Sequence, residues 1–124
     1  EDCSVFGDGE TSRDFCYVAN VVQANLLAAF APETATGAVY NVGLGGRTTL
    51  NDLHQQIRRQ VRRLRGAEPR SSKVHEPFRV GDPRQSTASI ARAARTLGYR
   101  PATSLAQGLA LTVAWHAEQG RDGS

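Results

Sequence analysis

Residues 38–65 read AVYNVGLGGRTTLNDLHQQIRRQVRRLR, and this stretch decides the fold class. The run 38–42 is β-prone and apolar up to Asn41, which predicts a strand inside a sheet covered on both faces. Residues 43–46, Gly-Leu-Gly-Gly, predict a loop. Thr49 and Asp52 form an approximate capping box, so we expect a helix from Thr49 to Gly66. Its apolar stripe comprises Leu50, Leu53, Ile57, Val61 and Leu64. Strand, loop and helix together indicate an α/β or α+β chain.

The flanking residues predict several further elements. On the amino-terminal side we expect a strand at 4–6, a turn at 7–9, and a hairpin or bent loop over 4–18. A helix over 21–31 would be capped by Asn20. Further along, we expect a short strand at 73–75, a Ser89-capped helix at 90–97 that stops at Gly98, and a helix from 105 to about 118 that starts with Ser104 and Gln107. About four helices and four short strands are too few for a full doubly wound sheet, so the chain looks like one mixed α/β part of something larger.

Composition bounds the class of protein. The 124 residues, 13.4 kDa and 40% hydrophobic content fit one domain spanning 1–124. No apolar run approaches the ~20 residues of a membrane span, and the acidic first residues do not resemble a signal peptide. Cys3 and Cys16 fit a reducing compartment, so we expect a cytoplasmic protein without a membrane partner. No pair of Cys or His residues has the spacing of a metal site.

The glycine loop at 43–46 imitates a dinucleotide-binding turn. The true fingerprint requires a third glycine where this chain has Thr48, and an acidic residue about 20 positions later. Tyr17, Tyr40 and Tyr99 also lack the lysine four residues on that would make a catalytic Tyr-x-x-x-Lys pair. We therefore expect an ordinary strand-to-helix turn and no complete catalytic apparatus.

The basic residues allow two interpretations. Fourteen of the fifteen are arginines, and the group at 58–65 could neutralise phosphates in a small module that binds nucleic acid or a partner protein. The region lacks interleaved aromatic residues, and the net charge is only +3, which weakens that interpretation.

Arg13, Arg79 and Asp82 are stronger candidates for a ligand-binding site. Arg13 follows the turn at 7–9, and Arg79 and Asp82 lie in a loop bounded by proline and glycine. Two arginines from separate loops can clamp a diphosphate with bidentate bonds, and a nearby carboxylate can accept from ribose hydroxyls. The alternative is structural, with Arg13 paired to Asp14 or Asp82.

Four segments resemble one family in the same order and spacing. GDGETSRDFCYV at 7–18 is similar to the GDGxxxRDFxYV segment of NAD-dependent sugar-nucleotide epimerases and dehydratases, which are extended short-chain dehydrogenases. The residues of this segment resemble most those of UDP-N-acetylglucosamine and UDP-glucose 4-epimerases. The other three segments are YNVG at 40–43 with Gly45, RVGD at 79–82, and LGYRP at 97–101 with the tail that follows it.

The resemblance implies the substrate-binding, carboxyl-terminal part of such an enzyme, because the amino-terminal NAD fingerprint and the Tyr-x-x-x-Lys pair are missing. NAD would then belong to the parent enzyme, and this chain alone would bind none and would be inactive. By resemblance, Arg13 and Arg79 would hold the diphosphate of a UDP-sugar and Asp82 its ribose. The backbone around Ser4 and Phe6 would lie against the uracil, with Ser86 facing the base.

Two further expectations follow from interpreting the chain as the substrate-binding part of such an enzyme. A parent dehydratase or decarboxylase stays open as the alternative to an epimerase, since the residues that select the reaction lie mostly in the missing half. Without the NAD-binding sheet, an apolar face and a strand edge would be exposed, which favours a homo-oligomer or a strand-exchanged dimer.

Overall fold

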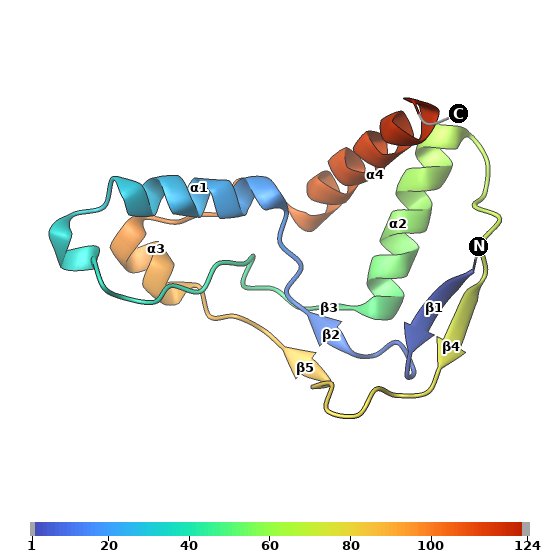
Figure 1. Cartoon of the computed structure of the whole chain (residues 1–124), viewed down its shortest axis with the longest axis horizontal. Coiled ribbons are helices and arrows are strands. Elements are labelled where there is room, and N and C mark those ends of the chain that lie inside the picture. The colour runs from blue at the N-terminus through green and yellow to red at the C-terminus, as the bar shows by residue number, and fades with distance from the viewer. Residues whose placement is uncertain (1, 123–124) are drawn as a thin grey trace.

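The chain folds as a mixed α/β structure, as the sequence predicts. A computed structural model describes residues 2–122, which contain four α-helices and five short strands (Figure 1). In chain order the elements are β1 (Cys3–Phe6), β2 (Ser12–Arg13), α1 (Val18–Ala29), the 3-10 turn η1 (Glu33–Ala35), β3 (Thr48–Thr49), α2 (Leu50–Arg65), β4 (Lys73–Glu76), β5 (Gln85–Ser86), α3 (Ala91–Leu97) and α4 (Leu105–Asp122).

The strands form two small sheets, and the hairpin that was one of the two alternatives expected for 4–18 does not form. β1 pairs in parallel with β4, with Cys3 opposite Lys73 and Phe6 opposite Glu76. β2 lies between β3, which is antiparallel to it, and β5, which is parallel. Of the two alternatives expected for 4–18, the hairpin is wrong and the bent loop is confirmed: the turn at 7–9 bends the chain, and β1 pairs with a strand 70 residues later. Parallel pairing needs such a long connection, and local turn signals do not reveal it.

Helix α2 forms for the reasons visible in the sequence. Thr49 is its N-cap, with Oγ1 accepting from the N–H of Asp52 at 3.0 Å, and Gly66 ends it with φ of +69°. α2 packs against α4 (Figure 1). α4 starts with the predicted Ser104–Gln107 box, in which the Ser104 N–H donates to Oε1 of Gln107 at 2.9 Å.

The start of helix α1 corrects a prediction. The helix begins at Val18, and Asn20 is inside it and 1% exposed, so Asn20 is not an N-cap. Its amide joins two distant segments instead: Nδ2 donates to the Thr103 carbonyl at 2.7 Å, and Oδ1 accepts from the Thr103 N–H at 2.9 Å. In α3 the cap is Ile90 rather than Ser89, while Gly98 ends the helix as predicted.

The fully buried core is small and lies between α1 and α3. It consists of Ala24, Ala93 and Tyr99, with Leu27, Tyr40, Val42 and Ile90 packed around it. The Tyr99 hydroxyl donates to the Gly43 carbonyl at 2.9 Å. This bond ties the glycine loop to the core.

The predicted strand at 38–42 does not form within the described residues. The segment lies beside α3 without a strand partner, and side chains take over part of the hydrogen bonding. Arg92 Nη1 donates to the Val39 carbonyl at 3.2 Å, and the Val39 side chain is 79% exposed. A strand needs a neighbouring strand, and residues 2–122 provide none at this position.

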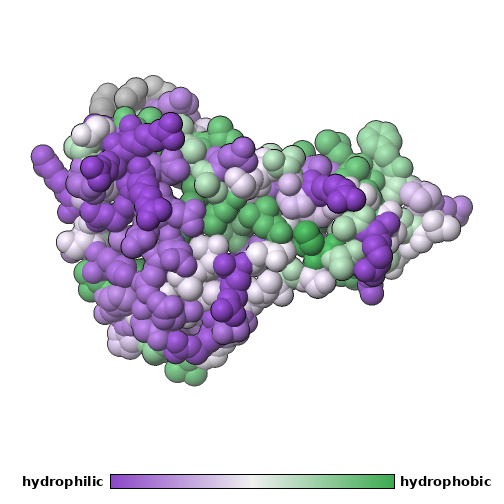
Figure 2. All heavy atoms as spheres, turned by 180° about the vertical axis from the view of Figure 1, so that it is seen from behind, coloured by the Kyte–Doolittle hydropathy of each residue, from purple (hydrophilic) through white to green (hydrophobic). Residues whose placement is uncertain are grey.

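Helix α1 and its C-cap residue Phe30 expose a line of apolar side chains. Val18, Val22, Leu26 and Phe30 recur every fourth residue and are 50–87% exposed. In the space-filling view from behind, apolar residues lie in the middle of the molecule and along the upper side of its narrow end, while the broad end is mostly hydrophilic (Figure 2). The sequence-based expectation of an exposed apolar face is confirmed.

Candidate functional site

The loop at 77–84, which we call the arginine loop, starts beside the turn at 7–9. The Gly7 N–H donates to the Glu76 carbonyl at 2.8 Å, and Nδ1 of His75 lies 2.7 Å from the Gly7 carbonyl. Gly7 has φ of +78°, and a Cβ there would collide with the Phe78 ring. Only glycine therefore allows Phe78 to pack against this turn.

Arg13 reaches the arginine loop from β2. Its Nη2 forms an ion pair with Oδ1 of Asp82, and its Nη1 donates to the Ser12 carbonyl at 2.8 Å. The Asp82 N–H in turn donates to the Arg79 carbonyl at 3.3 Å, which closes a turn between these two residues. Of the ion pairs that the sequence left open for Arg13, the structure therefore has the one with Asp82.

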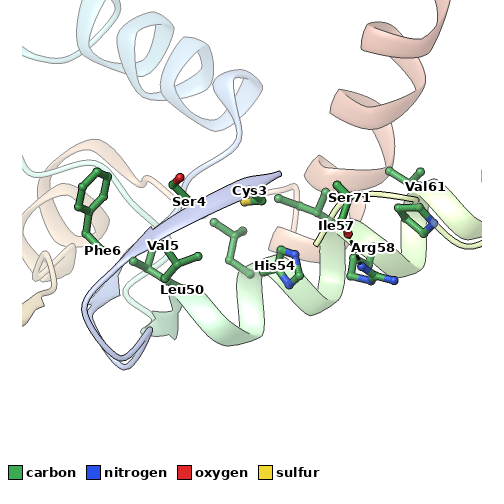
Figure 3. A pocket seen from close by; sticks show the side chains of 12 residues that line it. Cys3, Ser4, Val5, Phe6, Leu50, His54, Ile57, Arg58, Val61 and Ser71 are labelled. Atoms are coloured by element: carbon green, nitrogen blue, oxygen red, sulfur yellow. Dashed lines mark hydrogen bonds between the residues drawn. The ribbon is translucent and has the colours of Figure 1, made fainter. Parts of the chain in front are cut away.

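Arg79 lies against the end of β1. Its guanidinium carbon is 3.6 Å from the centroid of the Phe6 ring, a cation–π contact that covers one face of the aromatic ring. Ser4 precedes Phe6 by two residues, so the two side chains share one side of the strand. In Figure 3 they lie on the opposite side of β1 from Val5 and Leu50.

The predicted residues are thus linked through neighbouring contacts. Arg13 meets Asp82, Asp82 closes the turn with Arg79, and Arg79 covers Phe6. Ser86 is opposite Arg13 in the β2–β5 pairing and is exposed. The arrangement offers guanidinium donors and a carboxylate acceptor around one solvent-exposed loop, which suits an anionic, hydroxyl-bearing ligand.

Asp8 and Arg84 belong to the same region, and sequence reasoning missed them. Arg84 Nη2 lies 2.6 Å from Oδ2 of Asp8, and its guanidinium is 4.9 Å from the centroid of the Phe78 ring. The bond from Arg84, followed by that from the Glu10 N–H, lowers the pKa of the Asp8 carboxyl. In the sequence, the turn at 7–9 is a sufficient reason for an aspartate at position 8. The only signal for the ion pair was the opposite charge of Arg84, 76 residues later.

The glycine loop at 43–46 is occupied by a side chain. Asp14 accepts from the Leu44 N–H at 3.0 Å and from the Gly45 N–H at 2.9 Å, and a Cβ at Gly43 would collide with its carboxylate. These amide groups are the donors that a dinucleotide phosphate would need. The loop therefore does not fit a dinucleotide phosphate and acts as a structural turn.

An apolar cavity of about 300 Å³ lies between β1 and α2 (Figure 3). Its α2 wall contains four of the five residues of the predicted apolar stripe, all except Leu64, and β1 contributes each of its residues from Cys3 to Phe6. His54 of α2 also lines the cavity. Burial, followed by the charges of Lys73 and Arg58, lowers the pKa of His54, which keeps the ring neutral near pH 7. The cavity fits apolar groups better than a phosphate.

The described residues show neither a membrane helix nor a metal centre. None of the helices in residues 2–122 combines the length and the apolar character that crossing a bilayer requires. The same residues contain no group of three or more His, Cys, Asp or Glu side chains suited to a metal ion.

Comparison with known proteins defines the class. The family model described as GDP-mannose 4,6 dehydratase matches residues 1–112. The UDP-glucose 4-epimerase of Mycolicibacterium smegmatis is 39% identical over 109 residues, which cover 88% of this chain and 32% of that protein.

Solved structures agree with the sequence match. The UDP-glucose 4-epimerase of Thermotoga maritima, solved with UDP-glucose, superposes with a TM-score of 0.79 at 36% identity, over 96% of this chain and 36% of that one. The UDP-glucuronic acid 4-epimerase of Bacillus cereus, solved with UDP-glucuronic acid and NAD, gives 0.80 at 25% identity over 96% and 36%.

The chain therefore belongs to the GDP-mannose 4,6-dehydratase family, within the extended short-chain dehydrogenases. Its relatives include UDP-sugar 4-epimerases and dTDP-sugar dehydratases. It spans about a third of the length of the relatives that it matches. The family resemblance expected from the sequence is confirmed.

Proposed function

We propose that this chain is the nucleotide-sugar-binding part of an NAD-dependent UDP-sugar 4-epimerase. The observation that carries the proposal is the linked arrangement of Arg13, Asp82, Arg79 and Phe6 around the arginine loop. The solved relatives from Thermotoga maritima and Bacillus cereus hold UDP-sugars, which supports a ligand of this class.

The ion pair leaves binding capacity on both partners. Arg13 uses one hydrogen on each terminal nitrogen, so further donors of its guanidinium are available to a diphosphate. Asp82 uses Oδ1 for Arg13, and within residues 2–122 its Oδ2 accepts no hydrogen bond, so it can accept from a ribose hydroxyl. Arg79 supplies the second guanidinium of the clamp.

The base would lie at the end of β1. Arg79 already covers one face of the Phe6 ring, so we assign the uracil to the backbone around Ser4 and Phe6 rather than to a stack on that face. Ser86, opposite Arg13 on β5, is the proposed polar contact to the base.

NAD is assigned to the part of the enzyme outside these residues. The glycine turn is unsuited to a dinucleotide phosphate, because Asp14 holds its N–H groups. When bound in the family, NAD takes a hydride from the sugar and returns it. Residues 1–124 would contribute substrate binding and no turnover of their own, and a cytoplasmic location stays a prediction.

Calorimetry with UDP tests the clamp. We expect the wild-type chain to bind UDP and Arg79→Ala to bind about 10- to 100-fold more weakly, the range for losing a hydrogen bond to a charged group. Arg79→Lys should recover part of the loss. Arg95→Ala, an exposed arginine on α3, is the matched control and should bind like the wild type. Equal binding by wild type and Arg79→Ala rejects the proposal.

A dehydratase or decarboxylase parent is the second candidate, because the matching family is described as a dehydratase. The nucleotide-sugar site would be the same. Assay of the complete enzyme with UDP-glucose and dTDP-glucose separates an epimerised product from a 4-keto-6-deoxy sugar.

A basic binding module has less support. Arg58 and Arg62 both contact Glu68, at 3.2 and 3.0 Å, which neutralises part of the positive helix face. Salt-sensitive DNA binding that disappears when the arginines of 58–65 are replaced would favour this module.

A further inference from the structure

The arginine loop has almost no apolar anchor of its own. Residues 77–84 are all exposed, and Val80 is fully exposed. The loop nevertheless carries Arg79 and Asp82, two residues of the proposed clamp. Its conformation therefore depends on the few contacts that it makes with the segment from Phe6 to Arg13.

One of those contacts is a backbone hydrogen bond, from the Ser12 N–H to the Arg84 carbonyl at 2.9 Å. The ion pairs form two sets in which the acidic and basic partners are exchanged between the loop and the amino-terminal segment. At the Asp82 side, an arginine of the amino-terminal segment meets an aspartate of the loop. At the other side the roles are reversed, since Arg84 of the loop meets Asp8 of the turn at 2.6 Å. The second set continues through Phe78, whose ring lies under the Arg84 guanidinium and against Gly7.

This second set is next to Arg79 in the chain. Phe78 immediately precedes Arg79, so fixing the Phe78 ring against Gly7 also fixes the backbone from which the Arg79 side chain leaves. Asp8 uses its other oxygen as well, with Oδ1 accepting from the Glu10 N–H at 2.9 Å, so the carboxylate is itself held in place.

We propose that Asp8 and Arg84 are positioning residues that fasten the arginine loop to the turn at 7–9 and thereby hold the Arg79 guanidinium over Phe6, ready for the anionic part of the ligand. The inference rests on the proposed function for the identity of that ligand. The fastening itself concerns only residues of this chain.

The expected signature is a loss of binding without a loss of folding. Both partners are about half exposed, so the pair contributes little to global stability. A loop that is ordered before binding, however, does not have to be ordered by the ligand. Removing the pair should therefore weaken UDP binding while the unfolding midpoint stays unchanged.

UDP calorimetry on Asp8→Asn, Arg84→Gln and the double variant tests this coupling. We expect each single variant to bind about 2- to 10-fold more weakly, the cost of ordering one or two side chains. The double variant should bind no more weakly than Arg84→Gln, because Arg84→Gln already removes the ion pair that Asp8→Asn removes, together with the contact to Phe78. Arg84→Lys should recover part of the affinity. Single variants that bind like the wild type, or additive losses in the double variant, would overturn the inference.

A measurement without ligand separates this inference from the proposed function. In the wild type, the Phe6 ring should shift the Arg79 side-chain protons upfield in the NMR spectrum. In Asp8→Asn those protons should move toward their random-coil positions, whereas Arg95→Gln should leave them unchanged. Unchanged Arg79 protons in Asp8→Asn would refute the positioning role, whatever the outcome of UDP binding.

Discussion

The two ends of the molecule bury apolar surface in different ways. At the narrow end, which we call the arm, α1 and α3 enclose the fully buried residues Ala24, Ala93 and Tyr99. At the broad end, which we call the base, α2 packs against α4 and lines a cavity beside β1, and none of the α2 residues is buried. The arm thus has a closed core with specific bonds, whereas the base has an amphipathic helix over an open apolar surface.

The difference shows what each end depends on. The arm is small, so buried polar groups such as Asn20 and the Tyr99 hydroxyl must find partners, and they bind backbone atoms of Thr103 and Gly43. The stability of the base depends on the capping residues of α2 and on apolar side chains that are only partly buried. Single substitutions should therefore cost more in the arm than in the base.

Tyr99→Ala should have the largest effect. It removes a fully buried ring and its bond to the Gly43 carbonyl, so we expect a loss of about 3–5 kcal/mol, as for other buried aromatic residues. Ile57→Ala in α2 is the matched change, and it should cost less than half as much because Ile57 faces open cavities. Urea denaturation measures both, and an equal or larger loss for Ile57→Ala would abolish the distinction between arm and base.

High pH should weaken the arm through the same residue. Burial, followed by the nearby Cys16, raises the pKa of Tyr99 to about 12 from its ordinary value of 10.0. The folded state favours the neutral phenol, so its stabilisation is complete below pH 10 and is lost as the pH rises from 10 towards 12. Between pH 9 and 11.5 we expect the wild type to lose about 2 kcal/mol more than Tyr99→Phe, at 1.36 kcal/mol per pH unit above 10. Parallel stability curves for the two proteins would contradict the prediction.

The elements that the sequence predicted well carry their signals locally. The Thr49 cap, the apolar stripe and Gly66 lie within 18 consecutive residues, and α2 follows them closely. The strand at 38–42 does not form because residues 2–122 offer it no strand partner, and β1 pairs with β4 instead of within a hairpin because strand pairing can depend on residues far along the chain. Asn20 was misassigned for a related reason, since its partner Thr103 is 83 residues away.

The residues of the candidate site likewise divide into those that the local sequence indicates and those that it does not. Arg13, Arg79 and Asp82 could be selected because arginines in glycine-bounded loops suit a diphosphate, and the contacts among them fit that choice. Asp8, Arg84 and Asp14 could not be selected. Turn propensity accounts for Asp8, and nothing local indicates that Asp14 would take the amide groups of a loop 30 residues later.

The exposed line on α1 gives the last test of the comparison, with the smallest expected change in stability. Leu26 is 56% exposed between Val22 and Phe30. Leu64 on α2 is 48% exposed and lies between Gln60 and Arg63 of its own helix and the α4 residues Ala110, Val113 and Ala114. Replacing either leucine with glutamine should change the unfolding free energy by no more than about 0.5 kcal/mol, as at other surface positions.

Self-association should separate the two leucines, because Leu26 belongs to a continuous exposed apolar line, whereas Leu64 lies at the edge of the contact between α2 and α4, beside Gln60 and Arg63. We expect the wild-type chain to form dimers or larger oligomers in sedimentation, Leu26→Gln to shift the equilibrium towards monomer, and Leu64→Gln to behave like the wild type. A fluorescent dye that binds exposed apolar surface should bind equally to the wild type and Leu64→Gln, and less to Leu26→Gln. A wild type that stays monomeric at every concentration would refute the predicted homo-oligomer. Equal effects of the two substitutions would show that the α1 line does not drive association, and that the arm and the base differ only in their interiors.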